Sequence, residues 1–227
     1  MSEHEFPMMG GTMGLMSAAV DAPTAMIAEA VHRAGLVASQ DRPAVVKMWN
    51  RPAMLFYRVD SEEWRRREAC GAEPITRMEI LDLLMGLPLG QDIPVPSLAP
   101  WERRAMGKAP RGALRRHGDM VRRLAQVPLY PELALVWSRG WKQGIRAAGL
   151  FAPFCARALV IEQPLRRIAE ATMELDFWGV GLLSGTHGDL EPLVHPQPYV
   201  PNRFTPARWR FAEQITHQIH TNSPQTK

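Results

Sequence analysis

AVVKMWNRPAMLFYRV, residues 44–59, is the stretch of sequence that decides the fold class. Its two halves, residues 44–49 and 54–59, are rich in β-branched and aromatic residues, which fit the pleated surface of a sheet. Between them lie Asn50, Arg51 and Pro52, a combination typical of a turn. The stretch therefore predicts a pair of strands near the start of the chain.

Helices are expected on both sides of this strand pair. Upstream, Asp21 is a candidate N-cap and Gly35 a candidate stop signal for a helix with one apolar face. Downstream, Thr76 and Glu79 have the spacing of a capping box, and Gly86 suits the end of the helix that follows. The N-terminal part of the chain is thus predicted to mix helices with strands.

Proline density marks the next boundary. Residues 88–100 contain Pro88, Pro94, Pro96 and Pro100, which are too closely spaced for regular secondary structure. We therefore predict a Pro-rich linker or loop over residues 88–100. It would separate an N-terminal α/β lobe, residues 1–87, from a helical, arginine-rich lobe, residues 101–227.

The second lobe is expected to be helical through most of its length. Apolar residues recur near helical spacing, which predicts helices over residues 101–106, 111–126 and 131–148. Residues 175–183 and 190–195 are typical of strands joined by a glycine-rich turn. Thr205, followed by Pro206, predicts the start of a last helix. The expected fold class is α+β, with a mostly helical middle, an N-terminal strand pair and a C-terminal β-hairpin plus final helix.

The charge of the chain is modestly basic, and arginine carries most of it. The formal net charge is +4, and the only lysines are Lys47, Lys108, Lys142 and Lys227 among 27 cationic side chains. The planar arginine fork suits phosphate groups and guanine edges, so an anionic partner is plausible. A GC-rich genome would also favour arginine codons, and composition alone does not separate these explanations.

Cysteine content and hydropathy bear on the compartment. Two cysteines, Cys70 and Cys155, exclude a disulfide scaffold and a four-cysteine zinc site, and they indicate a reducing compartment. Residues 8–16 are apolar but short, no basic residue precedes them, and Asp21 follows. This pattern fits neither a signal peptide nor a membrane span. We expect a cytoplasmic protein with no membrane partner.

The densest run of cations extends from residue 103 to residue 123. If residues 111–126 are helical, Arg111, Arg115 and Arg122 share one stripe, with Arg116 and Arg123 beside it. Such a row of guanidinium groups suits a phosphate backbone, although a solvated surface of ordinary arginines is the alternative. The candidate nucleic-acid-binding residues of this run are Arg103, Arg104, Lys108, Arg111, Arg115, Arg116, Arg122 and Arg123.

Two further clusters are candidate contacts for nucleic acid. Trp64 precedes the first cluster and could stack on a base, although a tryptophan is more often part of a core. The second cluster stands at the start of the last helix, where cations oppose the helix dipole and would favour an anion or an acidic partner. Glu191 or Glu213 could satisfy these cations equally well. The candidate residues are Arg65, Arg66 and Arg67 in the first cluster and Asn202, Arg203 and Arg208 in the second.

Evidence for catalysis is thin. His187 and Asp189 lie in a segment similar to the catalytic loop of aminoglycoside phosphotransferases, but Val194 stands where that loop needs asparagine, and no aspartate follows. With His195 they could ligate a metal, whereas a tight turn containing Gly188 explains them more simply. The sequence contains no nucleophile elbow and no P-loop. We expect a protein without catalytic activity, metal site or cofactor.

The C-terminal part carries a resemblance to a known family. The segments concerned are residues 177–183 (FWGVGLL), 194–201 (VHPQPYVP) and 204–214 (FTPARWRFAEQ). They resemble the small large-subunit proteins of type IV CRISPR effector complexes. The resemblance implies a non-catalytic subunit that caps the crRNA 5′ end, contacts the protospacer-adjacent motif of target DNA and binds other subunits. It also implies that Cys70 and Cys155 are remnants of a lost zinc ribbon.

A second hypothesis comes from a different class of protein. A helix over residues 111–126 could be the recognition element of a helix-turn-helix in a DNA-binding regulator or plasmid-replication protein. That hypothesis predicts a stable dimer and palindromic sites. A third hypothesis, an enzyme that uses His187 and Asp189, predicts a bound metal.

Overall fold

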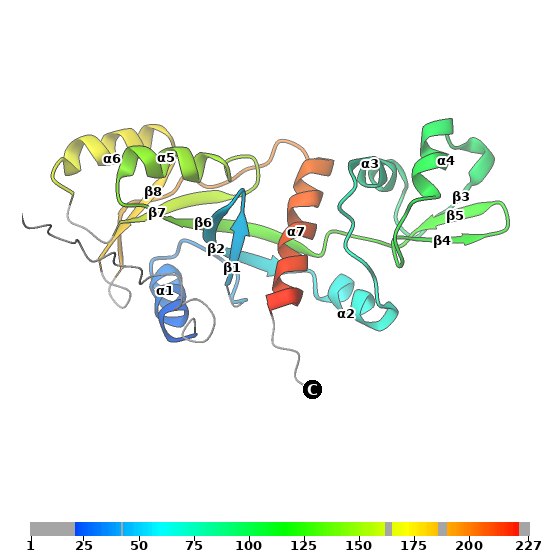
Figure 1. Ribbon diagram of the computed structural model, residues 1–227, viewed down its shortest axis with the longest axis horizontal. Coiled ribbons are helices and arrows are strands. Elements are labelled where there is room, and N and C mark those ends of the chain that lie inside the picture. Colours follow the sequence, from blue (N-terminus) through cyan, green and yellow to red (C-terminus); the bar gives the residue numbers. More distant parts are fainter. Residues whose placement is uncertain (1–20, 42, 162–164, 186–189, 223–227) are drawn as a thin grey trace, which may run out of the picture.

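A mixed sheet of six strands forms the centre of the larger part of the molecule (Figure 1). The computed structural model describes residues 21–41, 43–161, 165–185 and 190–222. The strands, in spatial order, are β1 (Ala44–Met48), β2 (Arg51–Val59), β6 (Leu129–Trp137), β7 (Ala156–Ile161), β8 (Gly181–Ser184) and β9 (Glu191–Val194). β6, β7 and β8 run parallel, whereas the other neighbours pair antiparallel.

Helices cover both faces of this sheet. Along β2, Met54 and Phe56 face one layer and Leu55 faces the other, because side chains alternate along a strand. α1 (Asp21–Arg33) packs on the first face. The opposite face is covered by α5 (Trp141–Gly149), α6 (Ile168–Phe177) and α7 (Pro206–Asn222). A three-layer α/β/α arrangement results (Figure 1).

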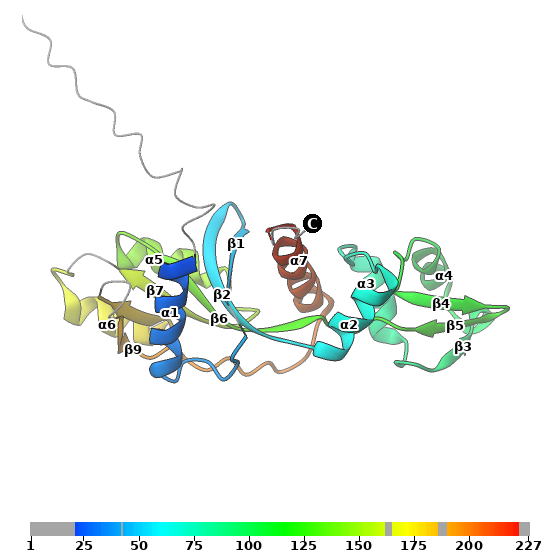
Figure 2. The same ribbon diagram turned by 90° about the horizontal axis from the view of Figure 1, so that it is seen from below.

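A smaller lobe lies at one end of the elongated molecule (Figures 1 and 2). Its sheet has the order β3-β5-β4 and is antiparallel throughout. The lobe contains α3 (Met78–Gly86), β3 (Asp92–Pro94), the short 3-10 helix η1 (Val95–Ser97), α4 (Pro100–Met106), β4 (Leu114–His117) and β5 (Met120–Arg123). Leu83, Val95 and Val121 are among the residues of its own apolar core.

α2 (Ser61–Cys70) and α7 join the two parts through buried polar side chains. Arg67 donates two hydrogen bonds to Glu213, at 2.7 and 2.8 Å, and one to Glu63 at 2.6 Å. Glu213 also accepts from the Trp209 indole N–H at 2.9 Å and from the Ile75 backbone N–H at 3.1 Å. Both carboxylates are fully buried, so this network holds the large sheet and the small lobe in one arrangement.

The predicted helix over residues 111–126 is wrong. The structure has the hairpin of β4 and β5 there, with Gly118 at φ +53° beginning a two-residue loop. Glycine at the first loop position matches the twist of the paired strands, which is why this hairpin turn favours it. The spacing of these exposed arginines does not distinguish a helix from a strand. Their predicted alignment along one side of a helix was therefore no evidence for a helix.

The predicted helix over residues 131–148 is also wrong. Its first half is the strand β6, and α5 begins only after Gly140. Leu133, Leu135 and Val136 are buried because helices lie on both faces of the sheet, and such strands show no alternation. With strands through its centre, the chain does not have the mostly helical middle that the predicted α+β class required.

Other predicted elements need smaller corrections. The strand expected over residues 175–183 is α6 up to Phe177, and β8 begins only at Gly181. Thr76 does not cap α3, which begins after Arg77 without a side-chain cap. The N-terminal strand pair is confirmed by β1 and β2. The last helix is confirmed too, because Thr205 Oγ1 accepts from the Arg208 N–H at 3.3 Å.

Candidate nucleic-acid interface

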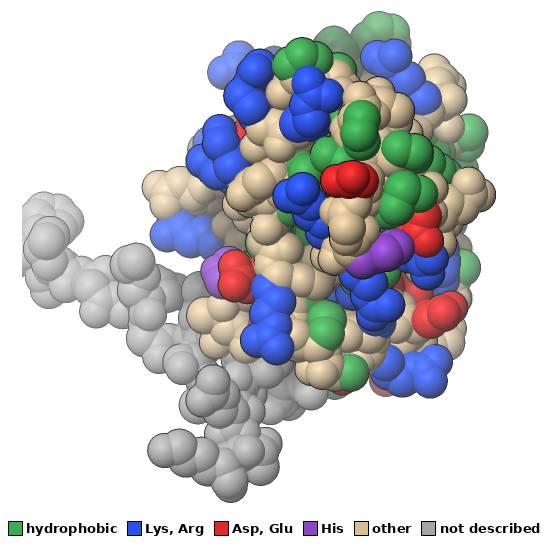
Figure 3. All heavy atoms as spheres, turned by 90° about the vertical axis from the view of Figure 1, so that its right-hand side faces the viewer, with side chains coloured by type: hydrophobic (Ala, Val, Ile, Leu, Met, Phe, Trp, Pro, Cys, Tyr) green, Lys and Arg blue, Asp and Glu red, His purple; other side chains and the backbone are tan. Residues whose placement is uncertain are grey.

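The small lobe holds most of the net positive charge of the chain. From Met78 to Arg123 it contains eight Lys and Arg against five Asp and Glu, a net charge of +3, whereas the whole chain has a net charge of +4. The remainder of the chain is therefore close to neutral. Figure 3 views this end of the molecule and shows Lys and Arg side chains spread across it. An anion approaching the protein is attracted mainly to this end.

α4 and the loop after it present several cations to solvent. Arg103 is exposed, yet it donates to the Leu98 carbonyl at 2.6 Å and so also ties α4 to the preceding loop. Arg104, Lys108 and Arg111 are exposed, and within the described ranges none of them forms an ion pair. The positive charge of these three side chains is therefore not neutralised by a carboxylate within the described residues.

The face of the small sheet that bears Arg115 carries a charged row. Arg115 of β4 stands opposite Arg122 of β5, and Asp92 of β3 stands next to Arg122. Arg122 forms a two-pronged ion pair with Asp92, with Nε 2.9 Å from Oδ1. The hydrogen bond from Arg122 lowers the pKa of Asp92, and the positive charge of Arg115 nearby acts in the same direction. Arg122 is thus neutralised, and Arg115 is left as the exposed cation of the row.

Arg116 extends the basic surface to the other side of β4. It stands opposite Val121, whose side chain is buried in the core of the lobe, but Arg116 lies near the end of the hairpin and is exposed. Since β4 is an edge strand, Arg115 and Arg116 present guanidinium groups on both faces of a projecting edge. The hairpin is therefore basic on either side.

Arg123, in contrast, is a structural residue. Its guanidinium donates to the carbonyls of Leu84 and Leu87, at 2.7 and 3.2 Å, and lies 4.8 Å from the centre of the Trp209 ring. Burial lowers its pKa. This side chain is half-buried and joins the lobe to α7, so its donors serve mainly the fold.

Two of the three arginines of α2 bind carboxylates within the protein. Arg65 is exposed and donates to the Ser61 carbonyl at 3.0 Å. Arg66 binds Glu63 at 2.7 Å and the Gly112 carbonyl at 3.0 Å. Arg67 is in the buried network. Burial works to raise the pKa of Glu63, but the hydrogen bonds from Arg66 and Arg67 outweigh it and hold the pKa below its ordinary value.

Trp64, the aromatic residue of this cluster, already has a stacking partner. Its ring lies 4.5 Å from the ring of His220 with an angle of 14° between the two planes. Its indole N–H donates to Glu68 at 2.9 Å. This stacking on α7 explains the position of the tryptophan without a base.

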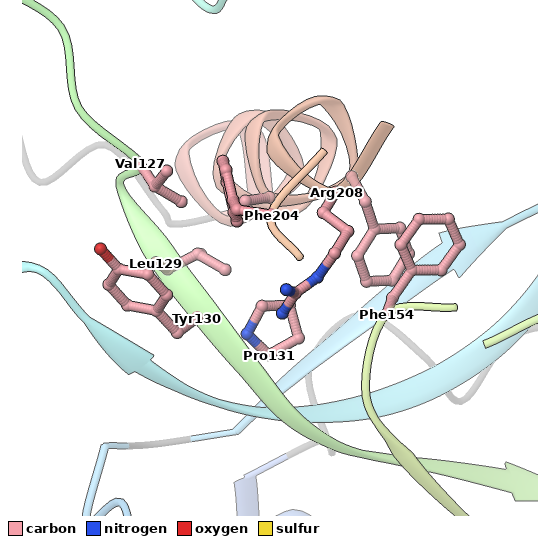
Figure 4. Close-up of a pocket in the computed structure, with 9 residues that line it drawn as sticks. Val127, Leu129, Tyr130, Pro131, Phe154, Phe204 and Arg208 are labelled. Carbon is pink, nitrogen blue, oxygen red and sulfur yellow. The ribbon is translucent and has the colours of Figure 1, made fainter. Parts of the chain in front are cut away.

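The third predicted cluster lies away from the lobe, at the start of α7. Asn202 and Arg203 are exposed. The Arg208 guanidinium stacks over Tyr199 and Phe204, at 5.0 and 5.4 Å from the ring centres. It borders a cavity of about 10 Å³ between α7 and β6, drawn in Figure 4. Such a cavity holds at most one water molecule, so it is no ligand site.

Two residues that the sequence analysis left out belong to the basic end. His117 continues β4 beside Asp92, with Nδ1 3.9 Å from Oδ1. Arg77 lines a cleft of about 480 Å³ together with Lys108 and Arg111. The sequence around Arg77 does not indicate a cleft, because the two walls of this cleft are far apart along the chain and meet only in the folded protein.

The described residues provide no evidence for a metal site or for a membrane-spanning helix. His187 and Asp189 lie outside the described residues. Among the residues that are described, no three His, Cys, Asp or Glu side chains are grouped as a metal site requires. Cys155 is fully buried, and burial raises its pKa to about 12. No helix in the described part of the chain combines the length and apolar character needed to cross a bilayer.

Comparison with known proteins identifies no relative. Neither a family model, a curated protein nor a solved structure matched the chain.

Proposed function

We propose that the chain is a non-catalytic nucleic-acid-binding subunit of a ribonucleoprotein, with the small lobe as its contact surface. One observation carries the proposal: exposed cations on α4 and β4 gather at one end and lack acidic partners in the described structure. Like charges held together in this way repel each other and destabilise the free protein. A polyanion lying against them would remove that repulsion and release its own counterions.

The shape of the basic end agrees with this role. β4 is the edge strand of the three-stranded sheet of the small lobe, so a nucleic-acid backbone can lie along it. Arg115 and Arg116 would then contact phosphates on either side of the edge strand, while Arg104 would contact the adjoining backbone. In this arrangement most of the affinity comes from phosphate contacts, which carry no sequence information.

The finer assignment rests on the sequence resemblance alone. We propose that the ribonucleoprotein is a type IV CRISPR effector complex, in which the chain contacts the crRNA 5′ end and target DNA at the protospacer-adjacent motif. The partners would be crRNA, target DNA and the other subunits, and the complex would work in the cytoplasm. Co-purification of short RNAs from the native host, followed by their sequencing, tests this assignment.

The helix-turn-helix hypothesis loses its recognition helix. It requires a helix over residues 111–126, and that segment forms β4 and β5. We therefore do not propose a regulator of that class.

Fluorescence anisotropy with a labelled 20-base-pair duplex tests the contact surface. The double variant Arg115→Ala, Arg116→Ala removes two exposed cations without touching a described hydrogen bond, and we expect its affinity to fall at least tenfold. The control is Arg51→Ala, Arg146→Ala, which removes the same charge from exposed positions outside the lobe. Equal affinity for both double variants would show that net charge, and not this surface, governs binding.

A further inference from the structure

An open cleft separates the segment before α3 from the loop after α4. Its volume is about 480 Å³, within the usual range for small-ligand sites. One wall contains Glu73, Pro74, Thr76, Arg77 and Ile80, and the other contains residues 107–111. None of these residues belongs to β3, β4 or β5, so the cleft is distinct from the charged strands of the small sheet.

Contacts at the base of the cleft fix the distance between its walls. The Glu73 N–H donates to the Arg111 carbonyl at 3.2 Å. Gly112, at φ +80°, leaves no room for a side chain, because a Cβ there would lie 2.7 Å from the Ala72 Cβ. Arg66 donates to the Gly112 carbonyl and is itself held by Glu63. The cleft is therefore preformed, and a ligand would not have to order it.

The charge of the cleft favours an anion. Arg77, Lys108 and Arg111 line it, against the single carboxylate of Glu73. Arg77 has Glu79 as a neighbour, with Nε 3.6 Å from Oε1, but both side chains are about half exposed, so this ion pair is weak. Lys108 and Arg111 have no ion pair within the described residues. The Arg111 guanidinium lies near Gly71, with Nη1 3.7 Å from the position of a Cβ added there.

Beside the cations the cleft has an apolar side. Pro74, Ala109 and Pro110 line it, and Ile80 is buried behind them. A flat ring can pack against such a surface, whereas inorganic phosphate would leave it uncovered. The Thr76 hydroxyl is exposed in the same wall and can donate or accept a hydrogen bond. A ligand with a phosphate at one end and a ring at the other would contact both the cations and the apolar side of the cleft.

We propose that this cleft binds one unpaired nucleotide, with its phosphate on Lys108 and Arg111 and its base against Pro74 and Pro110. The inference rests on the proposed function, because the nucleotide would belong to the strand that the protein holds. A paired base cannot enter a cleft of this kind, since its edge and both faces are occupied within the duplex. The cleft thus distinguishes single strands from duplexes, which the basic surface of β4 does not.

Binding of two labelled probes to the full-length protein tests the inference. The probes are a 10-nucleotide single-stranded RNA and a 20-base-pair DNA duplex. In the variant Lys108→Ala, Arg111→Ala we expect affinity for the single strand to fall about tenfold and affinity for the duplex to fall less than threefold. Glu73→Gln removes the opposing carboxylate and should tighten single-strand binding about two- to fivefold. AMP should compete with the single strand better than adenosine or inorganic phosphate does.

The outcomes separate this inference from the proposed function. If Lys108→Ala, Arg111→Ala binds the single strand as the wild type does while Arg115→Ala, Arg116→Ala no longer binds the duplex, the cleft assignment is wrong and the function stands. If the wild type binds neither probe, the proposed function fails. Direct binding of AMP, measured by calorimetry, without any binding of the single strand would instead make the cleft a mononucleotide site and would overturn its link to the strand.

Discussion

Replacing Arg67 by methionine should destabilise the protein strongly without involving nucleic acid. Arg67 is 8% exposed and donates four hydrogen bonds, two of them to Glu213. Without it, Glu213 is a fully buried carboxylate whose remaining donors are the N–H groups of Ile75 and Trp209. Glu63 suffers less, because Arg66 still binds it through both oxygens.

The expected destabilisation follows from this difference. Breaking a buried ion pair by removing one partner costs about 3–5 kcal/mol, because the other charge stays buried and unpaired. For a protein of this size about 1 kcal/mol corresponds to roughly 2–4 °C in Tm, so Tm should fall by about 6–20 °C. Adding Glu213→Gln removes the unpaired charge but keeps an acceptor for Trp209 and Ile75. The double variant should therefore regain part of the stability.

Urea denaturation followed by tryptophan fluorescence measures these free energies of unfolding. A cost below about 1 kcal/mol for Arg67→Met, or a double variant less stable than the single one, would show that Glu213 does not need Arg67 to stay buried as a charge. Weaker nucleic-acid binding by folded Arg67→Met than by the wild type would contradict the purely structural role of Arg67.

Three further predictions concern single side chains. The Glu63 pKa is lowered in the folded state, so its stabilising contribution is complete above the ordinary pKa of about 4.3 and is lost as the pH falls below it. Thermal melts from pH 7 to pH 3 should fall less steeply for Glu63→Gln. With Ellman's reagent at pH 8, Cys70 should react and Cys155, whose thiol has a pKa of about 12, should react only after unfolding. Gly144→Ala places a Cβ 2.4 Å from a Leu159 methyl group and should cost about 1–2 kcal/mol by calorimetry, since crowding in the core outweighs the gain in helix propensity.

Local signals in the sequence predicted the strand pair β1–β2 and the last helix, although the capping box expected at Thr76 does not form. Asn50 occupies a positive φ of 61° in the turn between β1 and β2, a conformation that asparagine tolerates well. Thr205 caps α7 as expected. The central strands were missed because burial on both faces removes the alternation that marks a strand, as the run from residue 133 to residue 136 shows.

The sequence predicted some of the exposed cations of the small lobe, but not which arginines are paired with acids. Charge density pointed to exposed cations of the small lobe, because Arg104, Lys108, Arg111, Arg115 and Arg116 are exposed there. The sequence does not show which arginines form ion pairs with carboxylates, because the carboxylates lie far from these arginines along the chain. The acids concerned are Glu213, 146 residues after Arg67, and Asp92, 30 residues before Arg122.

The salt dependence of duplex binding tests the central claim most directly, because the slope of log K against log salt is negative and becomes less steep by about 0.9 for each phosphate contact that is lost. We expect the slope of Arg115→Ala, Arg116→Ala to be less steep than that of the wild type by about 1.8, and the slope of Arg51→Ala, Arg146→Ala to be unchanged. An identical slope for all three proteins would contradict the account. The arginines of β4 would then serve only to keep an edge strand from pairing with other chains.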